Sequence, residues 1–237
     1  MSYRQQLEDA FASVLAEFNA SPGMQRLAGG ELGLEHYKSY LRQVFHHTRE
    51  NPQLQALATV YFKGHQRSVV KRFFKHATSE IGHDQLALND MAALGQDVSA
   101  IPVENPLPAT SALLAYGFYQ IYVKNPVGYL GYLYFLEFTP TQNGPAYMDQ
   151  LRGLGVPNEA LTFLKDHTTI DQGHNRLMHS YLEDLVTSSE DVQVVAYAMR
   201  TTGHLYARMV EDAFRHADDP QSYGVAVDEQ KFALPAA

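Results

Sequence analysis

Two short segments of the sequence place an acid, a glycine and a histidine in the same order. Residues 80–86 read EIGHDQL and residues 171–177 read DQGHNRL, so both follow the pattern acid-x-Gly-His-x-x-Leu. In each segment the carboxylate and the imidazole lie three residues apart, which makes them neighbours on a helix surface. A glycine inside a helix costs about 1 kcal/mol relative to alanine. Its presence before both histidines therefore indicates either a close approach by another helix or space needed beside a ligand.

The second segment carries one more histidine on the same helix face. At about 100° per residue, His167, Asp171 and His174 fall within a narrow sector of a helix. Leu164, Ile170 and Leu177 lie among them, so the sector is expected to point inward. Because a buried charge without a partner is costly, something must compensate it.

A third source of carboxylate is Glu137 in the stretch GYLYFLEFTP, where it is the sole acid among aromatic residues. Burying it requires a cation or a metal ion nearby. The candidate metal ligands are therefore three carboxylates and three imidazoles: Glu80, His83, Glu137, His167, Asp171 and His174. Paired acid-x-x-His motifs from separate helices build the di-iron sites of carboxylate-rich bundles. Imidazole and carboxylate without thiolate suit iron or manganese, although the ligand types do not exclude zinc.

Each acid-x-x-His pair has an ordinary alternative, as a satisfied pair on the surface or in the core, and the six residues could be separate structural pairs. His76 precedes Glu80 by one turn and is expected to orient a ligand without touching the metal. Asp84 is either a further ligand or a residue that orients His83. His46 and His47 face either a pocket or the helix surface. The remaining histidines are assigned structural or exposed positions: His36, His65, His179, His204 and His216.

The elements that must position these residues are helices, because apolar residues recur at the helical period and strand-like alternation is scarce. Prolines and glycines set the expected boundaries, with Asn158 as an N-cap, turns at Asn51-Pro52 and at residues 140–145, and a kink or break at Asn125-Pro126. The expected helices cover residues 2–19, 34–50, 52–63, 68–94, 109–138, 145–154, 159–186 and 190–216. The fold class is therefore all-α, a single-domain bundle of seven to nine helices over residues 1–217. Residues 218–237 form an extended or poorly ordered C-terminal tail.

Composition excludes several classes of function. The chain of 237 residues has a net charge of −8, which argues against nucleic acid and against an anionic membrane surface as partners. It has no cysteine, so thiolate metal sites and cysteine nucleophiles are excluded. No stretch reaches the roughly 18 apolar residues of a membrane span, and the acidic N-terminal segment is unlike a signal peptide. We therefore expect a cytoplasmic protein, and a homodimer is the commonest oligomeric arrangement for such a chain.

The series Glu80-x-x-His83, Glu137, His167-x-x-x-Asp171-x-x-His174 resembles the ligand series of the haem-oxygenase-like di-iron oxidases and oxygenases, in the TenA/Thi-4/PqqC-like superfamily. The resemblance extends from the first helix to about residue 216. It implies a compact haem-oxygenase-like bundle of about seven helices in which these six residues are the metal ligands, with Glu137 as a bridging carboxylate. It also implies two iron ions, with a single metal, manganese or another substitute ion as alternatives. The implied reaction uses dioxygen and a small organic substrate, such as a fatty acid or an amino acid.

Other branches of the superfamily fit these residues less well. Thiaminase-type members use a cysteine nucleophile that this chain lacks, and the glycine-rich distal helix of haem oxygenase is not found. Two alternatives stay open: a TenA-like protein without thiaminase chemistry, and a metal-binding or partner-binding bundle without turnover. A metal site that opens onto a cavity would favour the enzyme, and the aromatic stretch 116–138 would supply one wall of that cavity.

Overall fold

In a computed structural model the chain forms a bundle of long helices. The structure describes residues 1–223, except that the side chains of residues 169–172 lie outside the description. This part of the chain contains α-helices and 3-10 turns and no strand. The α-helices are α1 (Tyr3–Asn19), α2 (Pro22–Ala28), α3 (Leu34–Tyr61), α4 (Val70–Glu80), α5 (His83–Ala93), α6 (Pro108–Tyr122), α7 (Tyr129–Gly153), α8 (Thr162–Leu185) and α9 (Ser189–Asp218). The 3-10 turns are η1 (Gly64–Val69), η2 (Ile101–Val103), η3 (Pro126–Gly128) and η4 (Asn158–Ala160). The predicted all-α class is confirmed. Most of the expected C-terminal tail, residues 224–237, lies outside the described residues.

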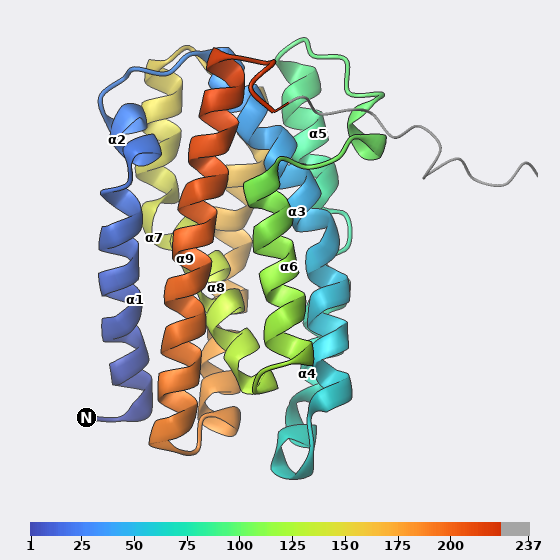
Figure 1. Cartoon of the computed structure of the whole chain (residues 1–237), viewed down its shortest axis with the longest axis vertical. Coiled ribbons are helices and arrows are strands. Elements are labelled where there is room, and N and C mark those ends of the chain that lie inside the picture. Colours follow the sequence, from blue (N-terminus) through green and yellow to red (C-terminus); the bar gives the residue numbers. More distant parts are fainter. Residues whose placement is uncertain (224–237) are drawn as a thin grey trace, which may run out of the picture.

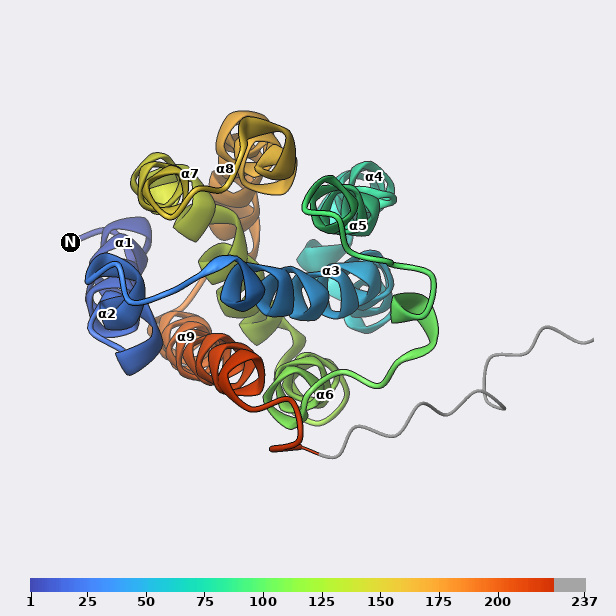
Figure 2. The same cartoon turned by 90° about the horizontal axis from the view of Figure 1, so that it is seen from above.

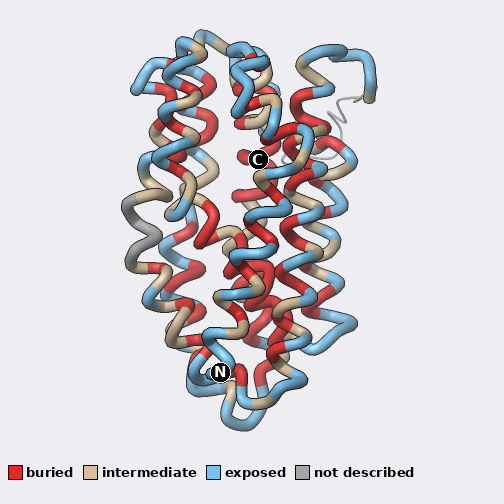
Figure 3. The backbone as a smooth tube through the Cα atoms, turned by 90° about the vertical axis from the view of Figure 1, so that its left-hand side faces the viewer, coloured by how far each residue is buried: buried red, intermediate tan, exposed pale blue. Residues whose placement is uncertain are grey.

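The long helices run along a common axis, with the connections gathered at the two ends (Figure 1). Seen from above, α3 crosses the middle of the molecule (Figure 2). Helices α4 and α5 pack on one side of it, α6 and α9 pack on another, and α7 packs against both α8 and α9. Buried residues line the inward faces of these helices (Figure 3). Helix α3 therefore lies between the α4–α5 pair and the helices α6 and α9.

The N-terminal helix forms because its apolar residues share one face. Leu7, Phe11, Val14 and Phe18 recur at helical spacing and are all buried. The ring of Phe11 meets that of Tyr134 edge to face with centroids 5.3 Å apart, so α1 covers the aromatic stretch of α7.

Several expected helix ends are wrong. Pro52 lies inside α3, and Pro140 and Pro145 lie inside α7, where turns were predicted. A proline inside a helix removes one hydrogen bond and costs roughly 3 kcal/mol. Burial on both sides offsets that cost, since Leu41 before Pro52 and Leu54 after it are both 0% exposed. The short helix α2 was not predicted at all.

The break at Asn125-Pro126 is confirmed. Helix α6 ends at Tyr122, and the Asn125 side chain accepts a hydrogen bond from the Val127 amide at the start of η3. Helix α7 then begins and packs closely on α9 at Gly131. A Cβ atom at Gly131 would lie 2.1 Å from the carbonyl oxygen of Val195, so only glycine allows this approach.

Candidate metal centre

The first acid–histidine pair lies across a break between two helices. Glu80 is the last residue of α4 and His83 is the first of α5. Between them Gly82 has φ of +99°, a left-handed conformation that glycine adopts without strain. The prediction of one continuous helix over residues 68–94, with a glycine in its middle, is therefore wrong. The pair still meets, because His83 Nδ1 lies 3.2 Å from Glu80 Oε2.

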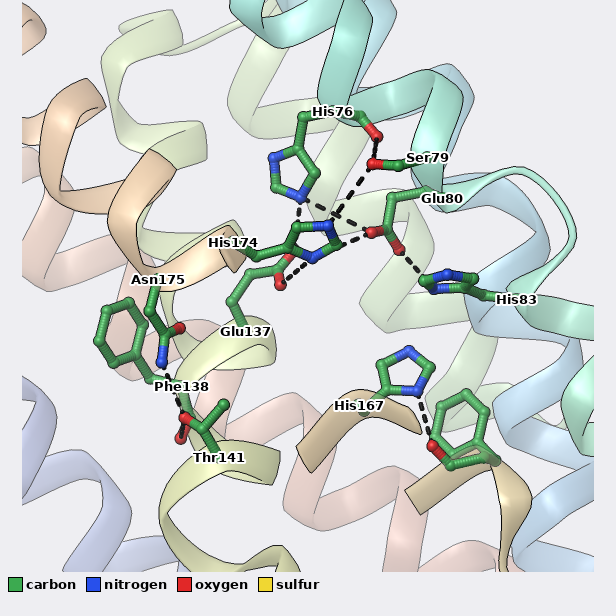
Figure 4. A network of polar contacts seen from close by, with 11 residues as sticks. His76, Ser79, Glu80, His83, Glu137, Phe138, Thr141, His167, His174 and Asn175 are labelled. Atoms are coloured by element: carbon green, nitrogen blue, oxygen red, sulfur yellow. Dashed lines mark hydrogen bonds and ion pairs between the residues drawn. The ribbon is translucent and has the colours of Figure 1, made fainter. Parts of the chain in front are cut away.

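Four buried side chains from three helices meet next to this break (Figure 4). His76 and Glu80 come from α4, Glu137 from α7 and His174 from α8. His76 Nε2 lies 3.2 Å from Glu137 Oε1, and His174 Nδ1 lies 3.0 Å from Glu137 Oε2. One ligand atom from each of the four lies within 4.8 Å of the others, which suits a shared metal ion. We call these four residues the inner group.

A second group of ligand atoms shares one member with the first. Glu80, His83 and His167 also offer atoms within 4.8 Å of one another, and we call them the outer group. His167 Nδ1 lies 2.7 Å from the Phe163 carbonyl oxygen, to which it must donate. This hydrogen bond leaves Nε2 with its lone pair available to a metal, an arrangement common in metal-binding histidines.

Glu80 connects the two groups through its two oxygens. Oε1 lies 3.3 Å from His174 Nδ1 and 3.6 Å from His76 Nε2, whereas Oε2 faces His83. Both oxygens of Glu137, in contrast, face the inner group. Glu80 is therefore the carboxylate that the two groups share, whereas the resemblance implied that Glu137 has the bridging position.

The charges in the inner group compensate one another. Burial raises the pKa of Glu80 and of Glu137, but contacts with His76 and with His83 or His174 outweigh this and lower both pKa values. Burial likewise lowers the pKa of His76, but the carboxylates of Glu137 and Glu80 raise it to about 9. At neutral pH protonated imidazole thus balances buried carboxylate, which is the role a metal cation would take over.

Five of the six predicted ligands lie in the two groups: Glu80, His83, Glu137, His167 and His174. The side chain of Asp171 lies outside the described residues. His76 was not predicted to reach a metal, yet it belongs to the inner group. The signal was its spacing of one turn from Glu80. Asp84 lies in neither group and accepts a hydrogen bond from its neighbour Gln85.

Helix α8, which carries His167 and His174, is fixed at its start by an acid from α5. Asp90 is 0% exposed, and its carboxylate accepts hydrogen bonds from the backbone amides of Thr162 and Phe163, both at 3.0 Å. The expected N-cap Asn158 instead accepts a hydrogen bond from Arg152. Asp90 thus joins α5 to α8, the two helices that contribute His83 and His167.

A cavity opens beside both groups. Glu80, Glu137 and His167 line it at one end, and its walls are largely aromatic and aliphatic, with Phe135, Tyr147 and Phe214 among them. His47 also lines the cavity, whereas His46 does not, although both are buried. The predicted aromatic wall is in part confirmed, because Phe135 and Leu136 belong to the stretch 116–138.

The residues of the two groups fit iron. Each group combines carboxylate with imidazole, the ligand types that iron takes in non-haem sites. The Nε2 atom of His76 is buried and has no hydrogen bond in the described part of the chain, although two carboxylates face it. A metal ion would satisfy this atom. Either group could hold a metal ion, and Glu80 belongs to both groups.

Comparison with known proteins agrees with this chemistry. The chain matches the family of iron-containing redox enzymes over residues 38–207 and belongs to that family. No curated protein matches it. A domain of unknown function with a haem oxygenase-like fold from Shewanella denitrificans is 28% identical, with a TM-score of 0.82 over 94% of this chain and 96% of the other.

Two further structures share the fold. A TenA homologue from Pseudomonas syringae is 13% identical with a TM-score of 0.74, over 90% of this chain and 93% of that one. A CADD-like protein of unknown function from Nostoc punctiforme is 17% identical with a TM-score of 0.64, over 92% of this chain and 96% of that one. The fold is therefore haem-oxygenase-like and TenA-like, as predicted. Among the described helices, none is long and apolar enough to cross a membrane.

Proposed function

We propose that this protein is a non-haem di-iron oxidase or oxygenase that uses dioxygen to oxidise a small organic substrate. Membership of an iron-containing redox family supports the metal. The observation that carries the proposal is the orientation of Glu80, whose two oxygens face two different sets of imidazoles at the end of a cavity. A bound pair of iron ions would supply the electrons and the coordination positions for dioxygen.

The protein's own residues have distinct tasks. Glu137 on α7 and His174 on α8 would hold one ion, and His167 would offer its Nε2 atom to the other. Phe135 and Tyr147 line the cavity, and apolar walls of this kind disfavour bulk water beside the ligands. The apolar walls favour a substrate with a substantial hydrocarbon part.

A metal-binding bundle without turnover is the rival function, and the cavity argues against it. A storage or sensor site has no need of a chamber that reaches its ligands. Here Glu80, Glu137 and His167 belong both to the ligand groups and to the cavity wall.

The test is anaerobic loading with Fe(II), followed by exposure to oxygen, with iron counting and optical spectroscopy. We expect about two irons per chain in the wild type and fewer in His83→Ala and in His174→Ala. Oxygen consumption is expected from the loaded wild type and from the loaded control, and not from these two variants. His179→Ala is the matched control, since His179 lies on α8 but in neither group. Equal iron in the wild type and in His174→Ala would refute the proposal.

A further inference from the structure

The cavity contains a second polar feature, whose residues belong to neither ligand group, on the central helix α3. His47 and Asn51 lie one turn apart, so their side chains share one face of that helix, and both line the cavity. His47 is only 5% exposed. Its Nε2 atom and the Oδ1 atom of Asn51 are both buried, and neither has a hydrogen-bond partner among the described residues.

The tyrosine hydroxyls in the cavity wall differ, because they are already satisfied. Four tyrosines line the cavity, and each hydroxyl has a partner: Tyr37 with the Ala160 carbonyl, Tyr40 with Tyr206, and Tyr147 with Asn19. Buried polar atoms normally find partners, since leaving them unpaired costs stability. His47 Nε2 and Asn51 Oδ1 lie one turn apart on residues that line the same cavity. A ligand in the cavity could therefore supply the hydrogen bonds that both atoms lack.

We propose that His47 and Asn51 form a binding subsite for an uncharged hydroxyl or amide group of the substrate, whose apolar body occupies the rest of the cavity. The amide oxygen of Asn51 accepts a hydrogen bond from the O–H or N–H of that group, and His47 Nε2 makes the second hydrogen bond. The inference rests on the proposed function only in treating this cavity as the substrate chamber.

The charge of the cavity restricts the ligand further. None of the described residues that line it is lysine or arginine. Burial, together with the charge of His167, lowers the pKa of His47 to about 4, so the ring is neutral at pH 7. A carboxylate beside His47 and Asn51 would therefore have no cationic side chain as a partner, and burying it would be unfavourable. A group that is polar but neutral meets no such penalty.

The experiment uses the metal-free full-length protein, so that no ligand can bind through iron. The probes are 1-octanol and 1-methoxyoctane, which differ in the O–H donor. Their affinities are measured by displacement of the neutral fluorophore N-phenyl-1-naphthylamine. The ratio of the two affinities is compared among the wild type, His47→Phe, Asn51→Leu and His46→Phe. His46 is the matched control because it is also buried, has unpaired ring nitrogens among the described residues and does not line the cavity.

We expect the alcohol-to-ether ratio to fall by about fivefold in Asn51→Leu, which loses the acceptor for the O–H group, and to stay unchanged in His46→Phe. His47→Phe should weaken both probes by about fivefold, because the oxygen atom of either probe can accept a hydrogen bond from Nε2–H. If His47→Phe does not fold, Asn51→Leu decides alone. An unchanged ratio in Asn51→Leu, an equal fall in His46→Phe, tighter binding of octanoate than of 1-octanol at pH 8, or no binding of either probe by the wild type would overturn the subsite. Iron loading of the wild type is measured separately. If the wild type binds no iron but Asn51→Leu still lowers the alcohol-to-ether ratio, the proposed function is refuted and the subsite stands.

Discussion

His76 adds a second histidine to the region around Glu137, where the sequence indicated only His174. Its ring centroid lies 4.2 Å from that of His174, and its Nε2 lies between the carboxylates of Glu80 and Glu137. It is 0% exposed, so no solvent replaces these contacts. A position of this kind suits a metal ligand better than a residue that only orients one.

We therefore predict that His76→Leu and Glu80→Ala affect iron binding differently. Removing His76 deprives only the inner group of a ligand, so the protein should lose about one of two irons. Removing Glu80 affects both groups, so both ions should be lost. Iron counting after gel filtration distinguishes these results, with His179→Ala as control. Full iron content in His76→Leu would assign His76 a purely structural role.

A different property distinguishes His46, which is buried away from the cavity. Burial, with the charges of Arg49 and Arg42, lowers its pKa to about 4. In the unfolded chain a histidine has a pKa near 6.5. As the pH falls below 6.5 the unfolded chain takes up a proton that the folded protein refuses, so stability is lost on acidification and is fully present above pH 6.5.

His46→Phe should therefore reduce the acid sensitivity of the metal-free protein. Between pH 7 and pH 5 the wild type should lose about 2 kcal/mol more of its free energy of unfolding than the variant does, from 1.5 pH units at about 1.4 kcal/mol each. Urea unfolding at the two pH values measures the difference. Parallel losses in both proteins would mean that His46 is protonated in the folded state.

At the scale of elements, the two acid-x-Gly-His segments look alike in sequence and differ in structure. Gly82 separates two helices with a positive φ, whereas Gly173 lies within α8. A Cβ atom at Gly173 would meet nothing within 4 Å in the described part of the chain, so no helix described there approaches it closely. The sequence shows the shared motif but not that one copy ends a helix, because the difference depends on how the following residues pack.

Alanine should consequently have opposite effects at the two glycines. Gly173→Ala should stabilise the protein by about 1 kcal/mol, the difference in helix propensity. Gly82→Ala should destabilise it by about 1 kcal/mol or more, since alanine is strained at φ of +99°. Thermal or urea unfolding of the metal-free proteins gives the sign directly. Destabilisation by Gly173→Ala would show that the space beside His174 is needed in the folded protein.

Asp90 caps a helix that is distant from it in the sequence, since Thr162 at the start of α8 follows it by 72 residues. Sequence patterns alone could not predict this contact. Asp90→Ala should destabilise the protein by about 2 kcal/mol, because two amides at the start of α8 lose their acceptor. Asp90→Asn should cost less, since one oxygen acceptor remains. Urea unfolding compares them. If iron binding weakens together with stability in Asp90→Ala, the cap also sets the distance between α5 and α8.

For the whole molecule, the sequence was sufficient for the helical class and for five residues of the two ligand groups, because periodicity and acid–histidine spacing are local properties. It was insufficient where a distant contact decides the outcome. Pro52 continues a helix because Leu54 beyond it is buried in the common core. The roles of His76 and His47 depend on which carboxylate or cavity faces them, and only the packing of α3, α4 and α7 determines this.

Metal binding should couple the two ligand groups to the stability and the pH response of the entire bundle. Because the carboxylates of the inner group raise the pKa of His76 to about 9, its ring carries a proton at pH 7 in the metal-free protein. A ligating imidazole must be neutral, so binding releases that proton. The affinity for Fe(II) or Mn(II) should therefore rise with pH, by up to about tenfold per unit for each proton released, between pH 7 and pH 8.5.

Because the ions bind the folded form, loading should also raise the melting temperature, and more so at pH 8.5 than at pH 7. Anaerobic titration followed by thermal unfolding at both pH values measures the two effects together. In His76→Leu the pH dependence should weaken by the contribution of one proton, whereas His179→Ala should behave like the wild type. An affinity that does not change with pH in the wild type would show that metal binding leaves His76 protonated, and would remove this residue from the metal centre.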